Sequence, residues 1–132
     1  MSNEIDFEEF INFALSSNTT TEIFELEIKE EACKSIKKHT KLNICTYKFI
    51  IQEEYIRHIK NKHEEDLFYL TKIPEILNSF SSVEKSLTRN TQTGQTDVSL
   101  VFRKKFDDGV VRMVALRVIK TKILSLKTLF RQ

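Results

Sequence analysis

Two long alternating segments joined by Asp108-Gly109 constrain the fold of this chain more than any other feature. Residues 98–106 alternate apolar with polar or basic side chains, and residues 110–119 resume as a second run rich in β-branched residues. An Asp-Gly pair between two such runs predicts a β-hairpin with a two-residue turn. The last third of the chain is therefore expected to be a β-meander.

The turn also predicts which residues oppose one another. With Asp108-Gly109 at the turn, Arg103 lies opposite Val114, and Lys105 lies opposite Arg112 on the same face. Two like charges in direct opposition are unfavourable. This face of the hairpin is therefore expected to meet solvent or an anion.

Residues 123–130 are expected to form a third strand. Uninterrupted alternation would place Leu124, Leu126, Thr128 and Phe130 on one face, and Ser125, Lys127, Leu129 and Arg131 on the other.

The first part of the chain is mainly helical in pattern. Apolar residues recur at helical spacing in 4–15, 29–39, 52–63 and 73–80, and Pro74 suits the first turn of the last of these helices. Residues 42–51 read as strand, and residues 22–28 as a short strand or the lead-in to a helix. Residues 81–94 are mostly polar, although Val83 and Leu87 could form a short strand, and residues 88–96 are the expected mobile loop.

This order of elements predicts an α+β fold, in which N-terminal helices pack on one side of a C-terminal twisted antiparallel β-sheet. A chain of 132 residues is long enough for one core. We expect an N-terminal helical extension over residues 1–20 and a single α+β domain over 21–132.

Charge is distributed unevenly along the chain. The net charge is +2, but residues 1–40 carry −5, residues 41–97 carry 0 and residues 98–132 carry +7. A basic segment of this kind favours nucleic-acid contact, because cations displace counterions from phosphates. The alternative is that the acidic N-terminal segment packs beside the basic sheet of the same molecule.

Cysteine and hydropathy patterns bear on the compartment. Cys33 and Cys45 fit no CxxC spacing and are too few for a disulfide framework, so we expect two reduced, semi-buried thiols. No run approaches the ~18 apolar residues of a membrane span, and the acidic start lacks the layout of a signal peptide. A cytoplasmic protein without membrane contact is expected.

Two histidines, His58 and His63, lie on the predicted helix over residues 52–63. On that helix His58 shares a polar side with Glu54 and Lys62, whereas His63 follows two isoleucines at core spacing. Their separation of five does not match the i, i+4 pair of a helical zinc site. We expect no bound metal and no cofactor.

Three short motifs carry a resemblance to a known family. They are Tyr55-Ile-Arg-His-Ile-Lys-Asn-Lys-His63, Ile73-Pro-Glu-Ile76 and Leu126-Lys-Thr-Leu-Phe-Arg131. With the basic β-pattern before the last motif, the chain from about Glu30 onward resembles phage-borne members of the barnase, EndoU, colicin and RelE (BECR) superfamily of small ribonucleases.

The resemblance implies a function and a set of site residues. It implies a small metal-independent endoribonuclease, toxin-like and encoded by a phage or mobile element, that cleaves RNA by attack of the 2′-hydroxyl. A histidine, His58 or His63, would be general base or acid. Arg103 or Arg117 would hold the phosphate, and Ser125 or Thr128 would donate to it. Further cations expected to contact nucleic acid are Lys62, Lys105, Arg112, Arg117, Lys127 and Arg131.

The resemblance also implies partners and leaves alternatives open. RNA, with tRNA as one candidate, is the expected substrate in the host bacterial cytosol, and an immunity protein or a host defence protein is a candidate partner. The leading alternative is a non-catalytic phage-encoded inhibitor on the same scaffold that blocks a host defence protein. A further alternative is an RNA-binding module without turnover.

Overall fold

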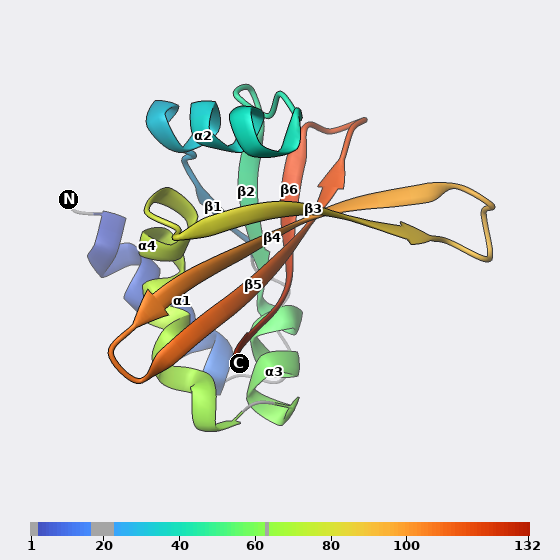
Figure 1. The fold of residues 1–132 in the computed structure, drawn as a ribbon. Helices are drawn as coiled ribbons and strands as arrows, with labels where there is room; N and C mark the ends of the chain where they lie inside the picture. Colours follow the sequence, from blue (N-terminus) through green and yellow to red (C-terminus); the bar gives the residue numbers. More distant parts are fainter. Residues whose placement is uncertain (1–2, 17–22, 63) are drawn as a thin grey trace.

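The computed structural model describes residues 3–16, 23–62 and 64–132, which form helices and one six-stranded sheet (Figure 1). The helices are α1 (Asn3–Ser16), α2 (Glu30–Thr40), α3 (Glu53–Lys62), the 3₁₀ helix η1 (Glu64–Lys72) and α4 (Ile73–Asn78). The strands are β1 (Ile23–Leu26), β2 (Lys48–Gln52), β3 (Ser82–Arg89), β4 (Thr96–Phe106), β5 (Gly109–Val118) and β6 (Ile123–Arg131).

The sheet has the order β1-β2-β6-β5-β4-β3. Strands β4 to β6 form the predicted antiparallel meander, and β3 pairs antiparallel with β4 at its edge. Strand β6 pairs in parallel with β2, whose other side pairs antiparallel with β1. The predicted α+β class is confirmed. The predicted helices over 4–15, 29–39, 52–63 and 73–80 are also present, with small shifts at their ends.

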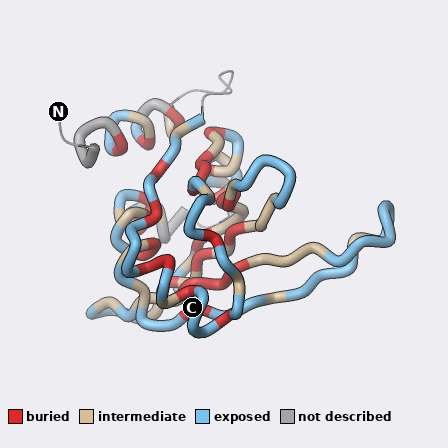
Figure 2. Tube along the Cα trace, turned by 90° about the horizontal axis from the view of Figure 1, so that it is seen from above, coloured by how far each residue is buried: buried red, intermediate tan, exposed pale blue. Residues whose placement is uncertain are grey.

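The helices cover one face of the sheet, and the hydrophobic core lies between them. Phe49 and Ile51 of β2 and Met113 of β5 belong to the same buried cluster as Ile56 and Ile59 of α3. Helix α1 joins this cluster through three side chains, Phe7, Ile11 and Ala14. Figure 2 shows the buried positions concentrated in this body, whereas the β3–β4 hairpin extends from it with mostly exposed positions. No described helix is both long and apolar enough to span a bilayer.

Helix α2 shows how the sequence sets an element's ends. Glu30 and Glu31 lie in its first turn, where the positive end of the helix dipole favours acids, and Lys37, Lys38 and His39 lie in its last turn. Lys41 then adopts a left-handed conformation with φ 67°, and its N–H donates to the carbonyl of Lys37.

The polar segment expected to be loop is largely strand. Residues 82–89 pair with 96–103 throughout, so only residues 90–95 form the turn of this hairpin. The prediction of a mobile loop over 88–96 was therefore too long. Pairing with β4 overrides the weak β-propensity of Glu84 and Lys85 in this segment.

The register of the β4–β5 hairpin differs from the prediction by two residues. Its turn is Asp107-Asp108, and Gly109 already pairs with Phe106. A Cβ at Gly109 would lie 3.3 Å from Cδ of Arg131, and φ there is +146°, so a glycine suits this position in the ladder. Each side chain keeps its predicted face, but Arg103 and not Lys105 lies opposite Arg112.

Strand β6 contains a β-bulge that the alternation pattern does not reveal. Thr128 pairs with Val114 and Leu126 pairs with Ala115, so Lys127 is an extra residue between them. Leu124, Leu126 and Leu129 thus face the core, whereas Thr128 and Phe130 share the other face with Ser125. The predicted division of faces was wrong beyond residue 126, because the bulge shifts the alternation by one residue.

The two cysteines are joined. Cys33 of α2 is buried, Cys45 precedes β2, and they form a disulfide with Cα atoms 5.3 Å apart. The expectation of two reduced thiols was therefore wrong. A sequence separation of 12 residues gave no indication that the turn after α2 brings the pair together.

Candidate functional site

The face of the sheet opposite the helices, called here the open face, gathers most of the predicted site residues. Its members on the three central strands are Ser99, Val101, Arg103, Lys105, Arg112, Val114, Leu116, Ser125, Thr128 and Phe130. Val101 is buried on this face, yet it is not part of the core cluster beneath the helices. The open face is thus a separate surface with its own packing.

Two arginines lie side by side on the open face, and they differ in their partners. Nη1 of Arg103 lies 2.6 Å from Oε1 of Glu84, and Nε of Arg103 lies 3.0 Å from Oε1 of Gln132. Cζ of Arg112 lies 5.5 Å from the ring centroid of Phe130. Within the described part of the chain, the guanidinium of Arg112 makes no ion pair or hydrogen bond. Arg112 therefore carries a charge that no described neighbour neutralises, as does Lys105 farther along β4 on the same face.

The two candidate hydroxyl donors also lie on the open face. Ser125 is 4% exposed, beside Leu116 and Ile50 on the neighbouring strands. Thr128 is half-buried beside Val114, two residue pairs along the ladder from Phe130 and Arg112 and on the same face. The bulge at Lys127 thus brings Thr128 to the arginines, and Thr128 is the more accessible of the two hydroxyls.

Lys127 connects β6 to α3 through a contact with Tyr55, near the C-terminal end of β2. Its Nζ donates to the hydroxyl of Tyr55 over 2.7 Å and lies 4.4 Å from the centroid of the same ring. His58 follows Tyr55 by one helical turn and is exposed. His58 is thus on α3 next to this junction, whereas the arginines are on the sheet.

Other predicted residues are not brought to the open face. Arg117 pairs with Leu124, and Arg131 pairs with Val111, so both belong to the helix-covered side of the sheet. His63 and the side chain of Lys62 lie outside the described residues.

Arg131 belongs to a polar network that sequence reasoning missed. The hydroxyl of Tyr69 in η1 donates a hydrogen bond to Oδ1 of Asp108, and Nη1 of Arg131 lies 3.2 Å from Oδ2 of the same carboxylate. The hydrogen bond from Tyr69 lowers the pKa of Asp108 below its usual 3.8; burial opposes this shift and Arg131 adds to it. The same bond, with burial, raises the pKa of Tyr69 above its usual 10.0.

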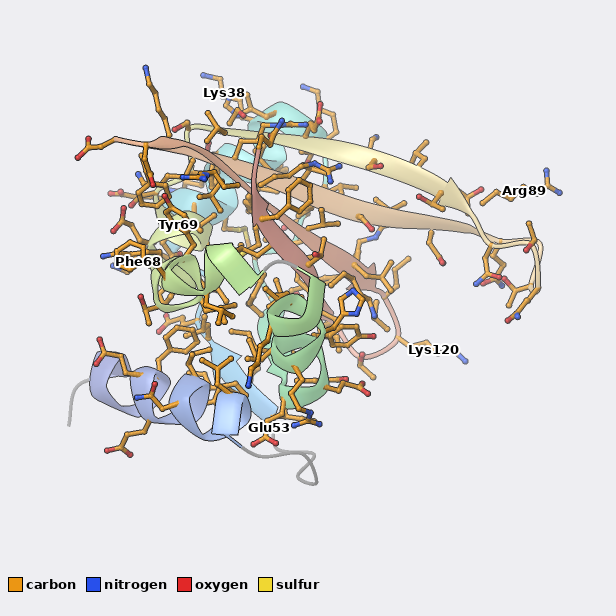
Figure 3. All side chains as sticks on the ribbon, turned by 90° about the horizontal axis from the view of Figure 1, so that it is seen from below. Lys38, Glu53, Phe68, Tyr69, Arg89 and Lys120 are labelled. Atoms are coloured by element: carbon orange, nitrogen blue, oxygen red, sulfur yellow. A yellow bond between two sulfur atoms is a disulfide. The ribbon has the colours of Figure 1, made fainter. Side chains whose placement is uncertain are left out.

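This network joins η1, the β4–β5 turn and the end of β6. Phe68 lies beside Tyr69 (Figure 3), with ring centroids 5.4 Å apart, and Nζ of Lys72 lies 5.5 Å from the Phe68 centroid. The three partners come from sequence positions 69, 108 and 131, and no motif links them. Only the folded chain brings them together.

Comparison with known proteins identifies the family. The family model described as phage-Barnase-EndoU-ColicinE5/D-RelE like nuclease3 matches residues 27–132. The chain belongs to this family of phage BECR-like nucleases. No curated protein and no solved structure matches the chain.

The family assignment agrees with the fold and confirms the resemblance. In the described residues, four α-helices and a mostly antiparallel six-stranded sheet form an arrangement consistent with a BECR-like nuclease. Membership points to nucleic acid as the substrate. Helix α1 lies before the matched residues, although it packs on the same core.

Proposed function

We propose that the protein is a metal-independent endoribonuclease that cleaves RNA on the open face of its sheet. The observation that carries this proposal is the arrangement of Arg112, Phe130 and Thr128 on two neighbouring strands, with the Arg112 charge not neutralised by a described neighbour. A cation, an aromatic ring and a hydroxyl are the groups needed to hold a nucleotide by its phosphate and its base.

The proposed reaction uses a nucleophile that RNA itself supplies. A general base removes the proton of the 2′-hydroxyl, and the 2′-oxygen attacks the adjacent phosphorus. The bond to the 5′-oxygen of the next nucleotide breaks, and a general acid gives that oxygen a proton. The products are a 2′,3′-cyclic phosphate and a free 5′-hydroxyl.

Arg112 is the proposed phosphate ligand. Negative charge grows on the non-bridging oxygens during attack, and a preorganised guanidinium stabilises that charge. Arg103 is the weaker candidate, because Glu84 binds its Nη1 and offsets its charge, and Gln132 binds its Nε. By binding Glu84 and Gln132, Arg103 is proposed to prevent these two side chains from pairing with Arg112.

The remaining roles fall to Thr128, His58 and His63. The hydroxyl of Thr128 is proposed to donate to a phosphate oxygen, with Ser125 as the less accessible alternative. His58 is the proposed general base or acid, with His63 as the second candidate. Lys127, Lys105 and Lys62 are proposed to attract the backbone of the RNA.

We further propose a toxin-like role in the cytosol of a bacterial host, with RNA such as tRNA as the target. An immunity protein or a host defence protein is then the expected protein partner. These proposals follow from the family and from the basic strands, whose residues 98–132 carry a net charge of +7.

The decisive experiment is cleavage of labelled tRNA and of total RNA in EDTA, followed by end-group analysis. The wild type is expected to leave cyclic phosphate ends, and Arg112→Met is expected to lose at least about 100-fold in rate. Lys34→Met, which removes a cation from the exposed side of α2, is the matched control and should cleave as the wild type does.

Other outcomes would redirect the assignment. Cleavage that requires a divalent metal, or that leaves 5′-phosphate ends, would contradict the proposed chemistry. Folded protein that binds RNA without cleaving it would favour the RNA-binding module. Folded protein that neither binds nor cleaves RNA would favour the non-catalytic inhibitor of a host defence protein.

A further inference from the structure

The sheet divides into two branches at one end. The β4–β5 ladder ends at the pair Ser99 and Leu116, whereas β3–β4 pairing continues to Arg89 and Thr96, and β5–β6 pairing continues to Val118 and Ile123. Figure 3 shows the branches apart, with Arg89 near the tip of one and Lys120 on the turn of the other. Figure 1 shows the same divergence from another side.

A cleft lies in this fork. Residues 95–98 line one side and residues 116–120 line the other, and we call it the fork cleft. Its lining includes Leu116 of the open face and Arg117, which belongs to the helix-covered side of the sheet. The fork cleft therefore connects the two faces.

Arg117 is the unusual residue of the fork cleft. Its Nε is buried, and among the described residues the Arg117 guanidinium has neither a hydrogen-bond partner at Nε nor an ion pair. A half-buried guanidinium loses hydration, and that loss is recovered only when an anion or acceptor reaches it. No described group accepts a hydrogen bond from this Nε, so Arg117 is suited to bind an external anion.

The other lining residues suit an anionic group that is part of a larger polar ligand. Lys120 adds a second cation, and Gln95 and Thr96 add neutral polar side chains. Beyond Ser99 and Leu116 the facing backbones of β4 and β5 are no longer paired with each other, so their polar groups also face the cleft. Asp97 is the one acid of the lining, and the net charge of the lining side chains remains positive.

We propose that the fork cleft binds a backbone phosphate of single-stranded RNA through Arg117, as an extension of the open-face site. This inference rests on the proposed function. Arg117 follows Arg112 by five residues on β5, or about 17 Å of strand. An RNA strand held at both arginines must extend over several nucleotides, so the preferred substrate is a single-stranded segment longer than a dinucleotide.

Binding of a non-cleavable RNA tests the cleft independently of catalysis. The probe is a fluorescein-labelled 2′-O-methyl 12-mer, whose blocked 2′-oxygen prevents cleavage, titrated by anisotropy at several salt concentrations. Arg117→Met is expected to weaken binding by about tenfold and to reduce the slope of log affinity against log salt by about 0.7. Binding of a 2′-O-methyl dinucleotide should not change.

Two variants serve as controls. Lys38→Met removes an exposed cation of α2, remote from the fork cleft in Figure 3, and should bind the 12-mer as the wild type does. Lys120→Glu changes an exposed turn residue of the cleft and should weaken binding of the 12-mer. This variant tests the cleft even if Arg117→Met does not fold. Since methionine removes an unpartnered half-buried charge, Arg117→Met is expected to melt no lower than the wild type.

The proposal fails if Arg117→Met and Lys120→Glu both bind the 12-mer with wild-type affinity, or if the wild type does not bind it. It also fails in favour of an acidic protein ligand if poly-L-glutamate binds more tightly than the 12-mer and loses affinity with Arg117→Met. Weakened 12-mer binding without RNA cleavage by the wild type would refute the proposed reaction and leave the fork cleft standing. If the wild type cleaves RNA but both variants bind the 12-mer with wild-type affinity, the proposed reaction stands and the fork-cleft proposal is refuted.

Discussion

Arg112 lies over the ring of Phe130 on the open face, with its Cζ 5.5 Å from the ring centroid. The ring holds the guanidinium in place through a cation–π contact and does not neutralise its charge. Phe130→Leu should keep the charge and lose this alignment, so we expect cleavage of RNA to fall by about tenfold, well short of the loss for Arg112→Met. Single-turnover rates on labelled RNA measure both.

A comparison with Phe80→Leu distinguishes loss of Arg112 alignment from a general loss of hydrophobic packing. Phe80 is also partly buried and packs on Phe102, on the helix-covered side. Phe80→Leu should therefore lower the melting temperature without a specific loss of rate. An equal loss of rate in both variants, at a temperature where both are folded, would refute the role of Phe130.

Thr128 and Ser125 differ in exposure, and this difference predicts a difference in function. Thr128→Val replaces a half-buried hydroxyl with a methyl group of similar shape and is expected to slow cleavage by about tenfold, the value of one charge-assisted hydrogen bond. Ser125→Ala alters a hydroxyl that is 4% exposed and is expected to leave the rate unchanged. The reverse order of effects would move the phosphate donor to Ser125.

His58 is exposed on α3, so His58→Ala should leave the fold intact. If His58 is the general base or acid, this variant should lose about 100-fold or more in rate and one limb of the pH–rate profile. His39, which is exposed at the end of α2 and bonded through Nδ1 to the carbonyl of Ser35, gives the matched control His39→Ala. A full rate in His58→Ala with loss in His63→Ala would transfer the role to His63.

The hydrogen bond from Tyr69 to Asp108 predicts a pH-dependent contribution to stability. The pKa of Asp108 is lowered in the fold, so its contribution is present above the usual 3.8 and is lost as pH falls through the lowered value. The pKa of Tyr69 is raised, so its contribution is present below 10.0 and is lost as pH rises through the raised value.

Tyr69→Phe measures this contribution. The difference in melting temperature between wild type and Tyr69→Phe should be constant at intermediate pH and should shrink at both extremes, where Asp108 gains or Tyr69 loses its proton. Tyr47→Phe, at another partly buried tyrosine, should show no such pattern. A difference that does not vary with pH would mean that the variant acts only through packing.

The Cys33–Cys45 disulfide closes a short loop and should stabilise the fold. For a separation of 12 residues, the loss of chain entropy in the unfolded state corresponds to about 3 kcal/mol. Urea unfolding with and without reductant, with the double variant Cys33→Ser and Cys45→Ser as a reference, should show the midpoint fall in the reduced protein. Two thiols that react without reductant in the native protein would contradict the bond.

The helices and the meander were predictable because they rest on local patterns. The 3.6-residue period of α2 and α3, the Pro at the start of α4 and the alternation before Asp107 each involve neighbours in sequence. The family was also visible in short motifs between Tyr55 and Arg131, and the match over residues 27–132 confirms it.

Five residues named from the sequence share one face of the sheet, but their arrangement on it was not predicted. Arg103, Lys105, Arg112, Ser125 and Thr128 were all named from sequence, and the structure places them on one face. Their relations were not predictable. The turn lies one residue earlier than the Asp-Gly signal indicated, so Arg103 opposes Arg112, and Glu84 from a strand expected to be mostly loop neutralises Arg103.

The sequence by itself determined the helices, the central strands and the basic character of the sheet, since hydrophobic period and charge are local properties of the chain. Tertiary structure alone decided the bulge at Lys127, the parallel pairing of β2 with β6 and the disulfide. Each depends on pairing between distant segments, in which a shift of one residue exchanges the faces of a strand. The interactions that fix such a register are spread over the whole core, and no single stretch of sequence contains them.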